Sequence, residues 1–285
     1  SESGADGGHR AVAPSARHQS TGRIAAAGHH VGTSVGDAWG LAHHISHVAL
    51  AAFVLAGRVT RAACAPLPMS PQCALIVFAK APMAGFAKTR LIPALGEVGA
   101  AHLADRLLAH ALAQACAAAI GPVELCCWPD TSHPAFQNLA QVHGVTLSDQ
   151  GEGDLGEKMA RALGRALQTH QGAIVMGTDA PGVDALYLQD AAAALQHKHA
   201  VFGPALDGGY TLVGLRAAQP ALFDAMPWST SSVMGETRLR LARLGIAHAE
   251  LAVLSDVDEP ADLAHLKPEW LSAILGREMA ASIQK

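Results

Sequence analysis

Aromatic residues are scarce in this 285-residue chain, in which only 4% of the residues are Phe, Trp or Tyr. Half of the residues are apolar, mostly Ala, Val and Leu, and 28 are glycine. This composition is more typical of a helix-rich α/β protein than of a β-sandwich. At this length the chain can bury a sizeable core, in one large domain or two small ones.

An excess of basic residues and a long apolar run are also missing. The formal net charge is −4 and the pI is near 6.4, so the charge gives no reason to expect a nucleic-acid partner. Any anionic ligand must be held by a local group of cations. The apolar run at residues 48–57 is far shorter than the ~20 residues that a membrane span requires, and we expect no membrane partner.

Cysteine is rare and irregularly spaced. The five cysteines are an odd number, include an adjacent pair and show no C-x-x-C spacing. We therefore expect reduced, mostly buried thiols in a cytoplasmic protein. They are Cys64, Cys73, Cys116, Cys126 and Cys127.

The first 70 residues differ from the rest of the chain. They are rich in His, Gly, Ser and Ala, and their apolar residues show little sustained periodicity. Met69 lies just before the first convincing strand. We expect residues 1–70 to be a poorly structured extension, dispensable up to residue 68, and residues 71–285 to form one domain.

From residue 72 onward, short apolar runs alternate with segments of helical periodicity. Strands separated by helices of about 10 to 15 residues indicate a mainly parallel sheet with helices on both faces. Strands are expected at 73–80, 123–128, 145–148, 173–176, 200–205, 210–215 and 249–254, and helices at 97–119, 133–142, 155–170, 185–196 and 231–244.

The first expected strand ends in a loop that carries Lys80, Lys88 and Arg90 around a Pro/Gly segment. A buried strand that leads through such a loop into a helix is how α/β proteins bind phosphorylated ligands. It is not the phosphate loop of the common ATPases, because Ala87 stands where Gly-Lys-Thr needs its glycine. The segment indicates nucleotide chemistry, with an ordinary charged surface loop as the alternative.

Acidic residues follow three of the expected strands. Asp179 either binds Mg²⁺ or Mn²⁺ bridging a diphosphate, or caps the next helix with Pro181 in its first turn. Asp207-Gly208-Gly209-Tyr210 is either part of a site or a hairpin turn. Residues 256–263 either begin a helix or supply a second metal carboxylate.

A glycine-rich motif occupies residues 150–159. Its glycines permit close approach of the backbone to a flat ring or a phosphate. A helix that begins near Leu155 would offer free N–H groups beside them.

Six motifs occur in a fixed order between residues 73 and 266. They are Phe78-Ala-Lys-Ala-Pro-x-x-Gly-x-x-Lys-Thr-Arg-Leu91, Gly153-Asp-Leu-Gly-Glu157, Gly177-Thr-Asp-x-Pro181, Asp207-Gly-Gly-Tyr210, Trp228-Ser-Thr230, and Asp256-Val-Asp258 with Asp262-Leu263. Together they resemble the radical-SAM/selenodomain-associated transferases, also called arsenosugar-biosynthesis glycosyltransferases. Because all six motifs occur in the same order as in that family, the match is far more specific than a match to any single motif would be.

This resemblance implies a Rossmann-like three-layer α/β fold of the glycosyltransferase-A (nucleotide-diphospho-sugar transferase) type, with the nucleotide at the carboxyl edge of the sheet. It also implies a nucleotide-activated donor, a small-molecule acceptor and Mg²⁺ or Mn²⁺. The residues expected to bind the nucleotide are Ala79, Lys80, Pro82, Gly85, Lys88, Arg90, Gly153, Asp154 and Lys158. Those expected to bind the acceptor are Gly208, Gly209, Tyr210 and Trp228, and those expected to bind the metal are Asp179, Asp256 and Asp258. The residues with expected catalytic roles are Asp207, Lys88 and Arg90.

Two departures from related families leave the reaction open. Metal-dependent glycosyltransferases of this fold carry Asp-x-Asp after the central strand, whereas this chain has Gly177-Thr178-Asp179. Asp256 or Asp258, or phosphate and water, would have to complete a metal site. Residues 88–91 also resemble the first loop of phospholactate guanylyltransferases. We expect glycosyl transfer from a nucleotide-diphosphate sugar, with nucleotidyl transfer and a non-catalytic nucleotide-binding module as alternatives.

A chain that begins at Met69 is expected to unfold at nearly the same thermal midpoint as the full chain, because all the expected strands and helices follow it. Thermal denaturation of both proteins, followed by circular dichroism, measures this. A large fall in the midpoint, or insolubility of the shorter chain, would assign residues 1–68 to the core.

Overall fold

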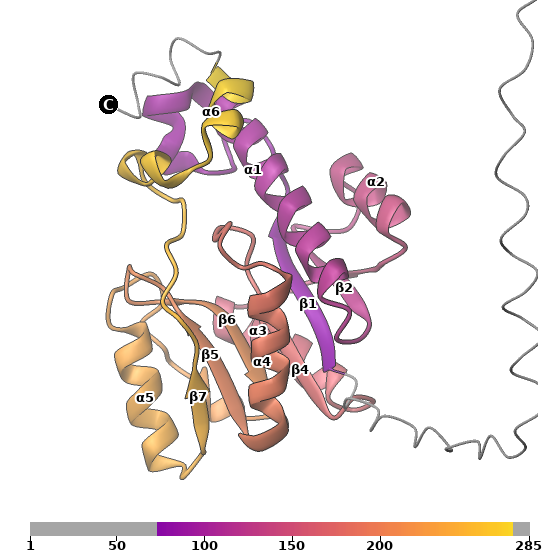
Figure 1. Ribbon diagram of the computed structural model, residues 1–285, viewed down its shortest axis with the longest axis vertical. Helices are drawn as coiled ribbons and strands as arrows, with labels where there is room; N and C mark the ends of the chain where they lie inside the picture. The colour runs from indigo at the N-terminus through magenta and orange to yellow at the C-terminus, as the bar shows by residue number, and fades with distance from the viewer. Residues whose placement is uncertain (1–72, 276–285) are drawn as a thin grey trace, which may run out of the picture. The chain divides into compact units, whose positions relative to one another are not determined.

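The computed structural model describes residues 73–275. The extension predicted at residues 1–70, with Cys64 in it, lies outside the described residues. Within them, the chain forms a single sheet with helices on both of its faces (Figure 1).

The sheet has seven strands in the order β3-β2-β1-β4-β6-β5-β7. Strand β6 pairs antiparallel with β4 and β5, and the other pairs are parallel. The prediction of an α/β fold with a mainly parallel sheet is therefore confirmed. The strands are β1 (Cys73–Lys80), β2 (Val123–Trp128), β3 (Thr146–Asp149), β4 (Gly172–Met176), β5 (Ala200–Pro204), β6 (Tyr210–Leu215) and β7 (His248–Glu250).

Alternate side chains of β1 point into two separate cores, because neighbouring residues of a strand face opposite sides of a sheet. Leu75 and Val77 pack with α1, α2 and α4, whereas Ile76 and Phe78 pack with α3 and α5. The fold is thus a three-layer sandwich. The helices are α1 (Ile92–Ala118), α2 (Pro134–His143), α3 (Leu155–Ala166), α4 (Ala185–His197), α5 (Val233–Arg243) and α6 (Pro268–Leu275), and the 3-10 helices are η1 (Thr89–Leu91), η2 (Pro220–Leu222) and η3 (Pro260–His265).

Two helices differ from an expected end by four or five residues, and α2, α4 and α5 differ by one or two. Helix α1 begins at Ile92, five residues before the expected start at 97. A proline in its first turn suits a helix start, and Gly96, with a φ of 70°, then interrupts the helical backbone. The expected helix corresponds to the part after this interruption. Helix α3 ends at Ala166 rather than at residue 170.

Strand β7 is shorter than the strand that was expected at 249–254 from the apolar run there. Its regular pairing with β5 stops at Phe202, and Pro204, two residues later, has no N–H with which to continue a ladder. Single hydrogen bonds still tie the chain to β5, from Leu251 N to Phe202 O (2.9 Å) and from Leu254 N to Pro204 O (3.0 Å). The run is therefore extended but only partly a strand.

Residues 251–258, which we call the crossing segment, lead from β7 to η3 and α6, beside the beginning of α1 (Figure 1). Val257, Leu263 and Leu271 pack there with Leu91 and Leu103 in a third core. The N–H of Val257 donates to the carbonyl of Asp179, just after β4 (2.9 Å). This packing brings the last acidic motif to the carboxyl edge of the sheet.

Within the part of the chain that the structure describes, no helix combines the length and apolar character needed to cross a bilayer. Cys73, Cys126 and Cys127 are buried, Cys116 is half-buried, and all four thiols are free. Burial raises the pKa of Cys73 and Cys127 to about 12, so both thiols stay protonated and behave as small apolar groups. The cytoplasmic location stays a prediction.

Two glycines test how the hairpin between β5 and β6 packs. Gly208 has a φ of +90°, and a Cβ there would lie 2.1 Å from the carbonyl oxygen of Ser231. Gly208→Ala is therefore expected to lower the free energy of unfolding by about 2 kcal/mol. Gly235 lies in α5 with open space around it, and Gly235→Ala is expected to raise that free energy by about 0.5–1 kcal/mol. Urea unfolding measures both changes, and equal effects would contradict the close packing at the hairpin tip.

Candidate functional site

A cavity of about 580 Å³ opens at the carboxyl edge of the sheet. It is lined by the ends of β1 and β4, the start of β6, the loop of residues 81–91 and the crossing segment. Because β6 runs antiparallel to β4, its first residues lie at the same edge as the last residues of β4. Of the residues predicted from the sequence, the lining includes Ala79, Lys80, Lys88, Arg90, Asp179, Asp207, Gly209, Tyr210, Trp228, Asp256 and Asp258.

Lys88 brings a nearly buried cation to this cavity, with a side chain that is only 6% exposed. Its backbone is left-handed (φ 49°, ψ 46°), which is uncommon for a residue with a side chain. The ammonium lies 2.5 Å from Asp179 Oδ1 and 3.8 Å from Asp258 Oδ1, and it donates to the carbonyl of Val257 (2.7 Å). Lys88 therefore joins the 81–91 loop, the end of β4 and the crossing segment.

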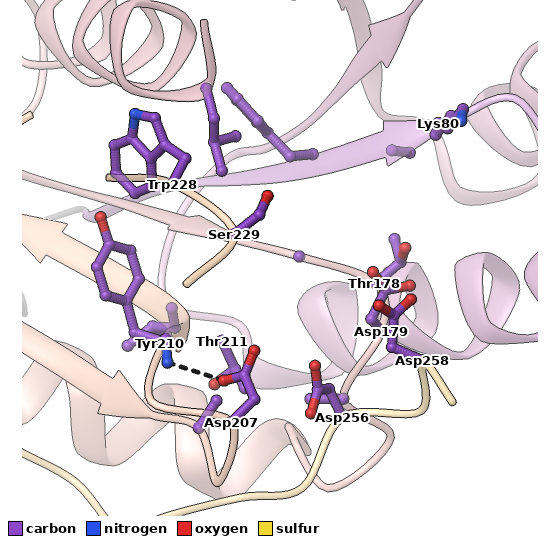
Figure 2. Close-up of a pocket in the computed structure, with 18 of the residues that line it drawn as sticks. Lys80, Thr178, Asp179, Asp207, Tyr210, Thr211, Trp228, Ser229, Asp256 and Asp258 are labelled. Carbon is purple, nitrogen blue, oxygen red and sulfur yellow. Dashed lines mark hydrogen bonds between the residues drawn. The ribbon is translucent and has the colours of Figure 1, made fainter. Parts of the chain in front are cut away.

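The carboxylates of Asp179 and Asp258 approach this ammonium from different segments of the chain and lie close together (Figure 2). Asp258 also accepts a hydrogen bond from Arg90, with 2.9 Å between Nη1 and Oδ2. The structure thus brings together two of the predicted metal ligands and two of the predicted phosphate-binding cations.

The helix-capping interpretation of Asp179 is wrong. The N-cap of α4 is Asp184, whose side chain accepts a hydrogen bond from the N–H of Tyr187 (2.9 Å). At the start of η3, the capping box is formed by Glu259 and Asp262. The acidic residues that line the cavity are therefore not the ones that cap these helices.

Asp207 and Asp256 form a second acidic pair in the cavity (Figure 2). Burial raises the pKa of the Asp256 carboxyl, and the carboxylate of Asp207 raises it further. One oxygen of Asp207 accepts a hydrogen bond from the N–H of Gly209 (2.8 Å), inside the turn between β5 and β6. The turn and site interpretations of residues 207–210 are therefore compatible, since the turn presents the carboxylate to the cavity.

The carboxylate oxygens of Asp179 and Asp258 fit a divalent cation that takes most of its ligands from phosphate and water. In residues 73–275, no three His, Cys, Asp or Glu side chains gather as a metal site. Asp179 and Asp258 nevertheless converge on one positive charge, the ammonium of Lys88. Hard carboxylate oxygens suit Mg²⁺ or Mn²⁺ when phosphate oxygens and water supply the remaining ligands.

Tyr210 and Trp228 form an aromatic wall of the cavity, with ring centroids 6.2 Å apart in an edge-to-face arrangement (Figure 2). Phe202 packs against Tyr210 in the same way. Among the described residues, the Tyr210 hydroxyl and the Trp228 indole N–H are buried without a hydrogen-bond partner. Since buried polar groups are nearly always hydrogen-bonded, these two donors suit an acceptor group on a bound molecule or a water.

Sequence reasoning missed Gln150, which is 8% exposed and lines the cavity. Its amide nitrogen donates to the carbonyls of Ala79 (3.2 Å) and Cys126 (3.1 Å). Arg161 donates to the carbonyls of Gln150 and Glu152, which holds the glycine-rich segment on α3. The sequence signals Gln150 only by its place as the first residue of that motif.

Two aromatic residues near the cavity were also missed. Phe86, which is 61% exposed, lies in the 81–91 loop and lines the cavity. Trp128 ends β2 and lies under the ammonium groups of Lys80 (5.7 Å to the ring centroid) and Lys158 (5.4 Å). These two predicted lysines are therefore brought together on one indole ring.

The other predicted residues lie outside the cavity lining. Asp154 is the N-cap of α3: its carboxylate accepts a hydrogen bond from the N–H of Glu157, and the Glu157 carboxylate accepts one from the N–H of Asp154 (both 2.9 Å). The expectation of free N–H groups at this helix start is therefore wrong for the two that this capping box uses. The residues outside the lining are Pro82, Gly85, Gly153, Asp154, Lys158 and Gly208.

Comparisons with known proteins point to one fold. A family model described as "Uncharacterized protein conserved in bacteria (DUF2064)" matches residues 111–230. A search of curated proteins found no match. The chain is similar to a crystal structure from Desulfovibrio desulfuricans G20 that is provisionally named a nucleotide-diphospho-sugar transferase. The identity is 26%, the match covers 75% of this chain and 96% of that chain, and the TM-score is 0.65.

Weaker likenesses include a cytidylyltransferase from Leptospira borgpetersenii (10% identity, 75% of this chain and 92% of that chain, TM-score 0.47). Another is the mannosyltransferase PcManGT from Pyrobaculum calidifontis in complex with GDP-Man and Mn²⁺ (14% identity, 75% and 74%, TM-score 0.42). These two TM-scores are too low to support an argument. The Desulfovibrio likeness confirms the predicted nucleotide-diphospho-sugar transferase fold, and the association with radical-SAM proteins stays a prediction.

Replacing Asp154 tests its role as the cap of α3. Asp154→Asn keeps a capping oxygen, so the free energy of unfolding is expected to stay within about 0.5 kcal/mol of the wild type. Asp154→Ala removes the cap and is expected to lower it by about 1 kcal/mol. Chemical denaturation measures both values. An Asp154→Ala protein as stable as the wild type would show that this carboxylate does not hold the helix start.

Proposed function

We propose that this protein transfers a sugar from a nucleotide-diphosphate sugar to a small acceptor. The observation that carries the proposal is the meeting of Lys88, Arg90 and two carboxylates in one cavity at the carboxyl edge of the sheet. Ligands of open α/β sheets bind at this edge. The Desulfovibrio likeness supports a transferase that uses a nucleotide.

The nucleoside would lie against the ends of β1 and β3. Ala79 and Gln150 line this part of the cavity, and hydrogen bonds to main-chain carbonyls fix the Gln150 side chain. A rigid polar group in a mostly apolar wall is what orients a small ligand. The diphosphate would then extend toward Lys88 and Arg90.

The leaving diphosphate gains negative charge when the bond between the sugar carbon and the β-phosphate oxygen breaks. Lys88 and Arg90 would stabilise that charge, and they accelerate the reaction only as far as they bind the leaving group more tightly than the donor. A bound Mg²⁺ or Mn²⁺ at Asp179 and Asp258 would neutralise further charge on the diphosphate.

The acceptor would occupy the part of the cavity between the hairpin and the aromatic wall. Asp207 would take the proton of the attacking hydroxyl while that oxygen bonds to the sugar carbon. Tyr210 and Trp228 line this part of the cavity and would give a sugar an apolar aromatic surface to pack on.

Nucleotidyl transfer is the second candidate, favoured by the resemblance of residues 88–91 to phospholactate guanylyltransferases. In that reaction an acceptor phosphate attacks the α-phosphorus of a nucleoside triphosphate, and pyrophosphate leaves. The single glycine of the 81–91 loop, Gly85, weighs against a triphosphate cradle. A non-catalytic nucleotide-binding module is the third candidate, and the presence of Lys88, Arg90 and Asp207 in one cavity weighs against it.

The assay that tests the proposal measures release of nucleoside diphosphate from nucleotide-sugars in the presence of Mn²⁺ or Mg²⁺. Slow release is expected, together with tighter binding of a nucleoside diphosphate than of the matching triphosphate in calorimetry. Lys88→Ala is expected to slow release at least about tenfold, equivalent to ~1.4 kcal/mol of transition-state stabilisation.

Lys198→Ala is the matched control, because Lys198 lies at the end of α4 and outside the cavity lining. Its release rate should equal that of the wild type. Pyrophosphate formed from a triphosphate and a phosphorylated acid, without turnover of any nucleotide-sugar, would favour the second candidate. Saturable nucleotide binding without any product would favour the third.

A further inference from the structure

The ammonium of Lys88 lies where the carboxylates of Asp179 and Asp258 converge. We propose that Lys88 and a divalent cation compete for these two carboxylates, so that the ammonium must leave before the ion binds. The inference rests on the proposed function in one respect only, namely that these side chains are the ligands of the ion.

The geometry makes the two cations mutually exclusive. The Lys88 nitrogen is 2.5 Å from Asp179 Oδ1 and 3.8 Å from Asp258 Oδ1, while Mg²⁺ and Ca²⁺ lie about 2.0–2.6 Å from their oxygen ligands. An ion bound by both carboxylates would therefore occupy the space of the ammonium. The two positive charges also repel each other strongly at such a distance in a partly buried place.

The two carboxylates do not depend on Lys88 for their positions. The N–H of Val257 donates to the carbonyl of Asp179, and the N–H of Asp258 donates to the side chain of Asp262 (both 2.9 Å). Arg90 holds the second oxygen of Asp258. A protein without the Lys88 ammonium would thus keep both carboxylates close together.

The lysine side chain can leave because its long stem is flexible and because a diphosphate offers it a stronger anionic partner. Once the ammonium contacts the diphosphate, the carboxylates are available to the ion. Nucleotide and metal would then favour each other's binding through one residue. In the nucleotide-free protein, the ammonium neutralises the acids and the ion binds weakly.

The test is Mn²⁺ binding by the full chain without nucleotide, measured by calorimetry and by the electron paramagnetic resonance signal of free Mn²⁺. Lys88→Met keeps an unbranched stem and removes the charge. It is expected to bind Mn²⁺ at least about tenfold more tightly than the wild type. Equal or weaker binding, or no binding by either protein, would overturn the proposal.

Lys80→Met is the matched control, because Lys80 lines the same cavity while its ammonium lies over Trp128. It removes the same charge from the cavity without freeing Asp179. A gain as large as that of Lys88→Met would show a general charge effect and contradict competition. Adding Asp179→Asn to Lys88→Met is expected to abolish the gain, and a gain that persists would place the ion elsewhere.

The wild-type chain gives an answer even if Lys88→Met does not fold. Amine-specific labelling followed by mass spectrometry is expected to modify Lys88 slowly in the free protein and faster when Mn²⁺ is added, with Lys198 as the unaffected reference. No change at Lys88 would contradict the proposal. Since no nucleotide is used, a failure of the proposed transfer reaction leaves these outcomes intact.

Discussion

The ion pair between Lys88 and Asp179 is the interaction that joins the 81–91 loop to the carboxyl edge of the sheet in the nucleotide-free protein. A lysine ammonium that is withdrawn from water needs an opposite charge and hydrogen-bond acceptors. Asp179 and the carbonyl of Val257 supply both, from two segments far apart in the sequence. Since Asp179 is 54% exposed, water screens the pair, and its importance lies in fixing the loop and the crossing segment relative to each other more than in stability.

The sheet explains why these groups meet. Parallel strands β1 and β4 end at one edge, and the antiparallel β6 begins there. Two apolar cores, one on each face, hold the strands rigidly, while the polar groups come from the loops that follow or precede them. This is the common division of labour in α/β proteins, in which a packed scaffold positions variable loops.

Short-range patterns in the sequence predict the scaffold well. The apolar runs at 73–80, 123–128 and 210–215 correspond to β1, β2 and β6 residue for residue. The hairpin-turn interpretation of residues 207–210 predicts the antiparallel pairing of β6 with β5. The pairing of β6 with β4, more than 30 residues earlier, has no such local signal. The same reason applies to the shortened β7, whose end is set by a proline on its neighbour β5.

The sequence predicts which types of residue form the site better than it predicts the contacts that each residue makes. Most of the charged residues that were chosen from the motifs line the cavity, since acids and cations at strand ends collect at one edge. Gln150 was missed because a single amide carries no pattern, and its role comes from hydrogen bonds to β1 and β2. Asp154 caps α3, a role that the sequence does not distinguish from that of a ligand-binding carboxylate, and its nucleotide-binding role stays a prediction.

The crossing segment also has a consequence for synthesis of the protein. Asp256 and Asp258 follow β7, so the ribosome reaches them only after all seven strands have been made. A nascent chain can therefore assemble its sheet and both main cores before the cavity has its last wall. The third core, around Val257 and Leu263, contains residues that are made after all seven strands. Ligand binding by a growing chain would then show that the crossing segment has reached its place. Resistance to proteolysis would show only that the sheet has formed.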